Sequence, residues 1–208
     1  MHLRTAFNSY AGHIRVTWPR SEDDQGLFYQ LTPKELAFLK KRQTSSEDGD
    51  AIYTAVLRFE PGALPFGTGR ADVRINQVRL WLVGVKVNED PAHRRRLMVN
   101  ITHTGDETFP DTSRQKLEFA HDTVNIQFEY DTAKVKTSND FTSKVVFSRQ
   151  GIENNWSGGD TKPTESAIAA IGPFTTWNIV IRESVNPGLQ MDEISEAWVE
   201  SWGANRPF

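Results

Sequence analysis

Alternation of apolar and polar residues with a period of two constrains the fold of this chain more than any other feature. It is clearest at residues 124–130, VNIQFEY. Because successive side chains of a strand point to opposite faces, such a run predicts a β-strand with one buried face. Related runs lie at residues 13–18, 52–60, 71–87, 97–103, 144–148, 177–182 and 194–202. The 208 residues are therefore predicted to form one all-β domain, an antiparallel β-sandwich of jelly-roll-like type.

Two of these runs carry finer predictions. Both faces of 52–60 are largely apolar, which predicts a central strand covered on both sides. The alternation in 71–87 changes phase at Asn76-Gln77, which predicts a β-bulge. The turn residues that follow predict a hairpin between 71–87 and 97–103.

One short helix is predicted near residues 32–42. Thr32 has the properties of an N-cap, Pro33 suits the first helical position, and Glu35 completes a capping box. Residues 150–164 are rich in Gly, Asn and Pro and predict a long loop.

The composition argues against several classes of function. Lys and Arg number 24 against 27 Asp and Glu, for a net charge of -3, so a nucleic-acid binder is not expected. The absence of Cys excludes disulfides, thiolate zinc sites and cysteine nucleophiles. No apolar run approaches the roughly 18 residues of a transmembrane segment. Residues 1–10 lack the apolar core of a signal peptide.

The nearest approach to a metal or catalytic cluster combines His103, Asp106 and Glu107 with His121-Asp122. These residues would meet only if a hairpin joined them, and no His-x-His or His-Glu-x-x-His spacing is present. The acidic loops also lack the spaced Asp pattern of a calcium site. We predict no metal, no cofactor and no catalytic residue. A weaker alternative is a hydrolase that uses Asp106, Glu107 and Asp122.

Tryptophans supply the candidate binding residues. Trp156 lies in the predicted long loop, flanked by Asn154 and Asn155, as on a sugar-stacking or protein-contact surface. An anchor tucked under the sheet is the other interpretation. Trp198 and Trp202 share one face of the final predicted strand, because they are four residues apart.

Glu200 lies between these two tryptophans and leaves open which face is buried. If the tryptophans are buried, Glu200 needs a cationic partner, and Arg182 is the nearest candidate in sequence. In the alternative, the opposite face points inward and the tryptophans form an exposed docking stripe. The residues of that opposite face are Ala197, Val199 and Ser201.

Five short segments are made of strand and turn residues and carry a resemblance to a known family. They are LPFG at 64–67, RINQVRL at 74–80, GPFTTW at 172–177, NPGLQM at 186–191 and RPF at 206–208. Together, over about residues 60–208, they resemble the C-terminal β-sandwich region of the A component of bacterial Tc (toxin complex) insecticidal toxins and its uncharacterised relatives. In that family the A component forms a pentameric pore, and its C-terminal region docks the B–C cocoon. This chain lacks the long helical shaft, so the resemblance implies an excised or stand-alone binding domain.

The resemblance and the lack of a coherent catalytic set together predict a non-enzymatic binding or assembly module of a secreted toxin-like system. Its expected partner is a toxin component or a host receptor, and its expected location is extracellular, within a toxin assembly. The alternative is a carbohydrate-binding module that presents Trp156, Asn154 and Asn155 to a glycan.

Overall fold

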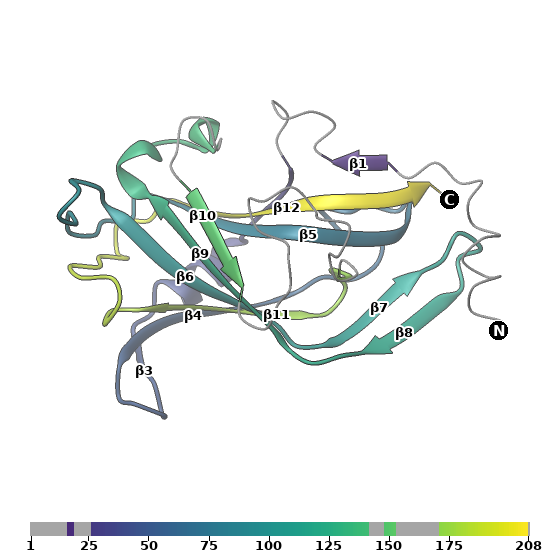
Figure 1. Ribbon diagram of the computed structural model, residues 1–208, viewed down its shortest axis with the longest axis horizontal. Coiled ribbons are helices and arrows are strands. Elements are labelled where there is room, and N and C mark those ends of the chain that lie inside the picture. Colours follow the sequence, from purple (N-terminus) through teal and green to yellow (C-terminus); the bar gives the residue numbers. More distant parts are fainter. Residues whose placement is uncertain (1–15, 19–25, 142–147, 153–170, 208) are drawn as a thin grey trace.

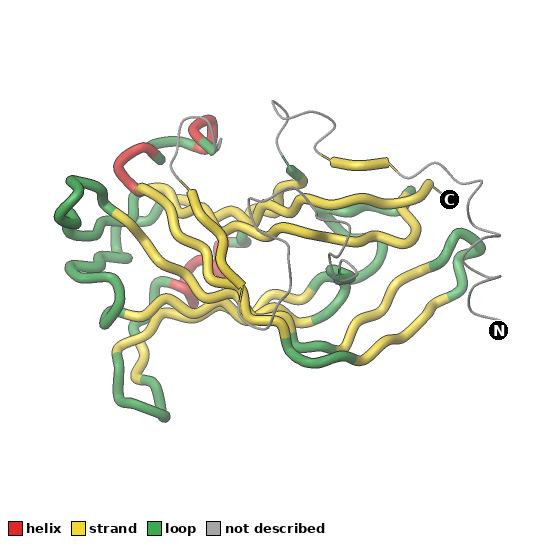
Figure 2. The backbone as a smooth tube through the Cα atoms, in the orientation of Figure 1, coloured by secondary structure: helices red, strands yellow, loops and turns green. Residues whose placement is uncertain are grey.

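The computed structural model describes residues 16–18, 26–141, 148–152 and 171–207. Two antiparallel sheets form the layers of the molecule, and a two-stranded hairpin extends away from them (Figure 1). The three short helical segments lie toward one end of the sandwich (Figure 2). The predicted all-β antiparallel fold with one short helix is confirmed.

The first sheet is built around β12, the last strand of the chain. β12 pairs with β5 along one edge and with β2 and then β1 along the other. The four strands of this first sheet are β1 (Val16–Trp18), β2 (Leu27–Gln30), β5 (Arg70–Val83) and β12 (Glu196–Pro207).

The second sheet has the strand order β10-β9-β6-β11-β4-β3, and the separate hairpin consists of β7 and β8. The strands are β3 (Gln43–Thr44), β4 (Ala51–Arg58), β6 (Arg96–His103), β7 (Asp106–Pro110), β8 (Lys116–Ala120), β9 (Val124–Asp131), β10 (Ser148–Ile152) and β11 (Thr176–Arg182). The helical segments are α2 (Pro33–Leu39) and the 3-10 turns η2 (Thr132–Lys134) and η3 (Ser138–Asp140).

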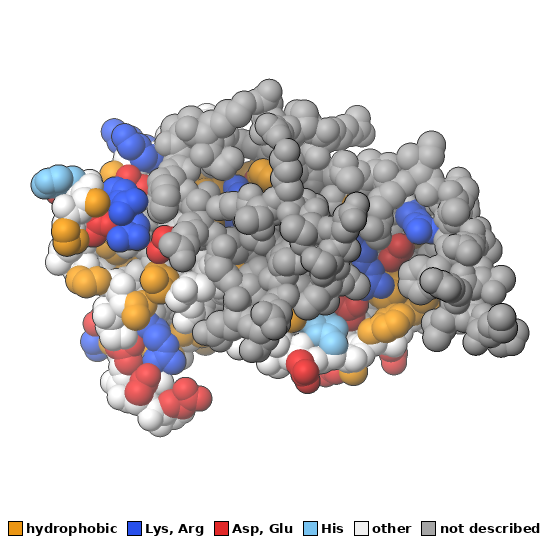
Figure 3. Space-filling view, in the orientation of Figure 1, with side chains coloured by type: hydrophobic (Ala, Val, Ile, Leu, Met, Phe, Trp, Pro, Cys, Tyr) orange, Lys and Arg blue, Asp and Glu red, His pale blue; other side chains and the backbone are white. Residues whose placement is uncertain are grey.

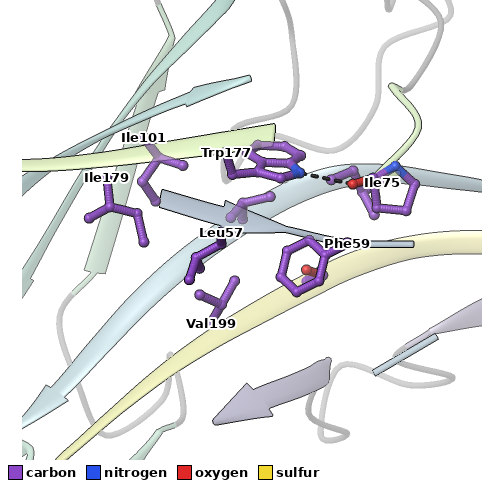
Figure 4. Close-up of a pocket in the computed structure, with 10 residues that line it drawn as sticks. Leu57, Phe59, Ile75, Ile101, Trp177, Ile179 and Val199 are labelled. Carbon is purple, nitrogen blue, oxygen red and sulfur yellow. Dashed lines mark hydrogen bonds between the residues drawn. The ribbon is translucent and has the colours of Figure 1, made fainter. Parts of the chain in front are cut away.

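One apolar core joins the two sheets, because alternate residues of each strand point between them. Trp177 of the second sheet and Val199 of the first line the same small cavity of about 10 Å³ (Figure 4). The indole of Trp177 donates a hydrogen bond to the Pro173 carbonyl at 2.9 Å, so its polar atom is satisfied inside the core. This dense interior holds the strands that carry the candidate sites.

Two local predictions are confirmed. Trp202 pairs with Gln77 and Gly203 with Ile75, so β5 carries one extra residue, Asn76, at the predicted bulge. The capping box is also present: the Glu35 carboxylate accepts from the Thr32 backbone N–H at 2.7 Å, and the Glu35 N–H donates to the Thr32 hydroxyl. The helix ends at Leu39, three residues before the predicted end.

The predicted hairpin between residues 71–87 and 97–103 is wrong. β5 pairs with β12 in the first sheet, whereas β6 pairs with β9 and β11 in the second. The chain leaves β5 through Gly84, whose φ of 93° suits glycine, and then crosses between the layers. Alternation assigns side chains to faces, but it does not identify the strand that pairs with each one.

Two further predictions need correction. The strand at 52–60 is covered on one face only, since Leu57 is 1% exposed while Val56 is 58% exposed. The loop predicted at 150–164 begins later, because β10 extends to Ile152 and pairs with β9. The rest of that loop lies outside the described residues. The short strands β2, β3, β7 and β8 were not predicted from the sequence.

Candidate functional site

The β7–β8 hairpin brings together His103, Glu107 and His121, three residues of the candidate cluster. His103 ends β6, Glu107 lies in β7, and His121 follows β8. One carboxylate oxygen, Glu107 Oε2, is 3.7 Å from His103 Nε2 and 3.6 Å from His121 Nε2. The two imidazole rings are stacked with their centroids 4.9 Å apart. Asp106 and Asp122, the other carboxylates of the hydrolase alternative, are exposed.

Both ring nitrogens of the buried His103 are already engaged. Its Nδ1 accepts a hydrogen bond from the Gly105 N–H at 3.0 Å. Its Nε2 lies 3.0 Å from the Gly172 carbonyl oxygen, so Nε2 carries the proton and donates it. His103 is therefore a neutral imidazole whose lone pair and N–H are both used within the fold.

Glu107 is buried and held by two donors. Arg74 donates to Glu107 Oε1 at 2.7 Å, and the Gly172 N–H donates to Oε2. The Arg74 guanidinium also contacts Asp72 at 3.0 Å and lies 3.9 Å above the Phe109 ring. The carboxylate thus has a cationic partner that compensates its desolvation.

This donor set does not fit a metal ion. A metal ligand must offer a free lone pair, and the Nδ1 lone pair of His103 is taken by Gly105. Arg74 places a positive charge on the carboxylate that would have to bind the cation. We interpret the cluster as a buried polar junction that ties β5, β6 and β7 to residue 172.

The junction makes the stability of the fold depend on pH. Burial lowers the pKa of His103, and the nearby His121 acts in the same direction, against the Gly172 carbonyl, Glu107 and Asp106. A lowered pKa means that the unfolded chain takes up the proton first. The free energy of unfolding should be insensitive to this group above about pH 6.5. Below that pH it should fall by up to about 1.4 kcal/mol per pH unit.

Urea unfolding measured from pH 7.5 to 5.5 checks this expectation. These values lie about one unit on either side of the pKa of a free histidine. His103→Gln should flatten the pH dependence. His93→Gln is the matched control, because the His93 side chain is 90% exposed. Equal slopes in His103→Gln and the wild type would contradict this role of His103.

The tryptophans of the final strand lie on the side of the first sheet away from the cavity between the sheets. Ala197, Val199 and Ser201 are buried, and Val199 and Ser201 line the cavity between the sheets. Trp198 and Trp202 point to the opposite side and are half-buried. Ala197, Val199 and Ser201 point inward, as in the second orientation, but the tryptophans form no exposed stripe: both are half-buried, and Trp198 packs against the core and against Phe141.

Glu200 is nevertheless 1% exposed, and its partners are not the expected ones. It accepts hydrogen bonds from Trp81 Nε1 and Trp202 Nε1, each at 2.8 Å, and from the Gly26 N–H at 2.9 Å. The proposed partner Arg182 belongs to the other sheet and bonds Asp48 at 2.7 Å instead. Indole and backbone N–H groups thus take the role expected of a cation.

The side of the first sheet away from the cavity carries a cluster that we call the aromatic face: Phe28, Arg79, Trp198 and Trp202. Arg79 is only 2% exposed, and the buried Phe141 packs against Phe28 and Trp198. The Arg79 guanidinium lies 4.5 Å from the Trp202 ring centroid. Phe28 meets Trp198 edge-on at 6.2 Å. The Trp198 indole donates to Glu196 at 2.8 Å. Hydrogen bonds and ring contacts therefore fix the orientation of both indoles.

The remaining candidate residues Trp156, Asn154 and Asn155 lie outside the described residues. At the end of the molecule formed by the β5–β6 connection, basic and acidic side chains are intermixed (Figure 3). There Arg96 contacts Asp90 at 2.7 Å and Arg95 contacts Glu89 at 3.1 Å. Within the described segments, no helix is both long and apolar enough to cross a membrane.

Comparisons with protein-family models, with curated proteins and with solved structures find no match to this chain.

Proposed function

We propose that this chain is a non-enzymatic assembly module of a secreted toxin-like system, and that it binds a protein partner through the aromatic face. The observation that carries the proposal is the placement of Trp198 and Trp202. Both indoles lie on the side of the first sheet away from the cavity, half-buried and held by hydrogen bonds to Glu196 and Glu200.

The composition and rigidity of this face favour a protein partner. Trp and Arg are the residues most enriched among those that dominate binding energy at protein interfaces. The indoles of Trp198 and Trp202 are already oriented in the free chain, so binding would order few additional rotamers. Arg79, which is only 2% exposed, stacks on Trp202 and helps to hold its ring in place.

The buried polar junction supports a non-enzymatic role. His103 and Glu107 are the best candidates for proton transfer, and each is engaged by neighbouring backbone or arginine groups. The hydrolase alternative has less support, because its other two carboxylates, Asp106 and Asp122, are exposed while Glu107 is buried. The resemblance of residues 60–208 to Tc A components favours a toxin component as the partner and an extracellular assembly as the location.

The proposal predicts that the B component of a toxin complex is encoded beside the gene for this chain, and the test uses that component. The purified B component should bind the immobilised full chain in biolayer interferometry with a Kd of about 1 μM or tighter, which corresponds to about -8 kcal/mol. Genes for metabolic enzymes alone around this gene, or no binding of the B component at about tenfold higher concentration, would contradict the proposal.

A further inference from the structure

The outer side of the second sheet presents an unusual set of uncharged hydrogen-bonding side chains. It is the side opposite the core, and its residues are half-buried or exposed. We call it the amide face, formed by Thr54, Asn100, Thr102, Asn125, Gln127 and Asn178.

These residues are adjacent because of the strand register. Thr102 of β6 pairs with Asn178 of β11 on one side and with Asn125 of β9 on the other. In the next row, Asn100 pairs with Gln127. Paired residues share one face of the sheet and sit on strands about 4.8 Å apart. The side chains therefore form a continuous surface.

Asparagine is an unfavourable residue within a strand, yet three asparagines meet here. Thr102 donates a hydrogen bond to Asn125 at 2.9 Å. The side-chain amides of Asn100 and Asn178 make no hydrogen bond to another of the residues that the structure describes. Among the described residues, these two side chains therefore add no hydrogen bond that would stabilise the sheet. Positions that oppose local preference without a structural gain are expected at functional sites.

The amide face also lacks charge, although 25% of the chain is charged. Charged residues border this face. Arg58 and Arg182 lie at strand ends, and Glu129 lies in the row next to Gln127, 3.6 Å from Arg96. Between the polar residues, Val56 is 58% exposed and Val180 is half-buried. The surface thus combines neutral donors and acceptors with apolar patches. It complements a ligand that carries hydroxyl groups and C–H surfaces but no charge.

We propose that the amide face binds a neutral glycan. Each side-chain amide offers both a donor and an acceptor, which matches neighbouring hydroxyls of one sugar ring. Val56 and Val180 contact the C–H face of the ring. This site is separate from the aromatic face, because the two lie on different sheets.

The test is an array of neutral, sialylated and sulfated glycans probed with the full chain, followed by titration of the best neutral oligosaccharide. We expect neutral glycans to bind. Asn178→Asp and Asn100→Asp should each weaken that binding about tenfold or more, because each removes the amide donor and adds a charge. Asn178→Ala tests the same loss without new charge. Melting temperatures should stay near the wild-type value, since neither amide bonds another of the described residues.

Asn139→Asp is the matched control, because Asn139 is an exposed asparagine in η3, and it should bind like the wild type. Trp202→Ala should also retain glycan binding, so the result is independent of the proposed function. Three outcomes would overturn the proposal: binding restricted to acidic glycans or absent, full binding by Asn178→Asp, or a dimer in sedimentation that Asn178→Asp dissociates. The last would make the face an interface between two copies.

Discussion

Replacing Glu200 with alanine should lower the free energy of unfolding by at least about 3 kcal/mol. The substitution removes the acceptor of three N–H groups, those of Trp81, Trp202 and Gly26. Trp81 is fully buried, so its indole N–H finds no water in exchange. Each buried donor left without an acceptor costs about 1–3 kcal/mol. Urea-induced unfolding at neutral pH measures the change.

Glu196→Ala is the matched control. Glu196 lies on the same strand and accepts from the Trp198 indole at the same 2.8 Å distance, but at a partly exposed position. Water can replace it there, so the cost should stay below about 1 kcal/mol. Equal effects of the two substitutions would mean that burial does not set the contribution of Glu200.

Replacing Gly203 with alanine should cost about 3 kcal/mol. Gly203 lies at the bulge, and an added Cβ would come within 2.0 Å of the Arg74 carbonyl oxygen and 2.8 Å of the Ile75 Cα. Both are backbone atoms of β5. Relief therefore requires the two longest strands of the first sheet to separate, which disrupts their ladder of hydrogen bonds.

Gly69→Ala provides the comparison for this substitution. An added Cβ at Gly69 meets no atom within 4 Å, so the free energy of unfolding should change by no more than about 0.5 kcal/mol. Thermal or urea unfolding of the two variants measures the difference. A Gly203→Ala protein as stable as Gly69→Ala would contradict the close approach of β5 and β12.

Local features of the fold are predictable from the sequence because they depend on neighbouring residues. The phase change at Asn76-Gln77 locates the bulge, and Thr32 with Glu35 locates the start of α2. Pairing between distant strands is not encoded in this way. The partner of residues 71–83 is β12, more than a hundred residues later, and no turn signal connects them.

The candidate sites were predictable to different degrees. The meeting of His103, Glu107 and His121 required a hairpin, and β7–β8 supplies it. Their engagement by Gly172 depends on a distant backbone segment, so the sequence left open whether they are free to react. The amide face did leave a signal. Asn100, Asn125 and Asn178 fall on the polar positions of alternating runs, where threonine is more usual.

In the final strand, one residue, Glu200, makes it hard to predict from alternation which face is buried. Glu200 between two tryptophans suggested either a buried ion pair or a solvent face. The structure has a buried carboxylate on a half-buried face. The three N–H donors that stabilise it come from β5, from β12 itself and from residue 26. No periodicity in the sequence encodes that combination.

The affinity of the B component for Trp202→Ala tests the central claim most directly, namely that the aromatic face is a docking surface. Measured by biolayer interferometry well below the melting temperature, Trp202→Ala should bind at least about tenfold more weakly than the wild type, a loss of about 1.4 kcal/mol. Phe38→Ala removes an aromatic ring that is 49% exposed on α2 and should bind as tightly as the wild type. Equal affinities for the wild type and Trp202→Ala would contradict the claim.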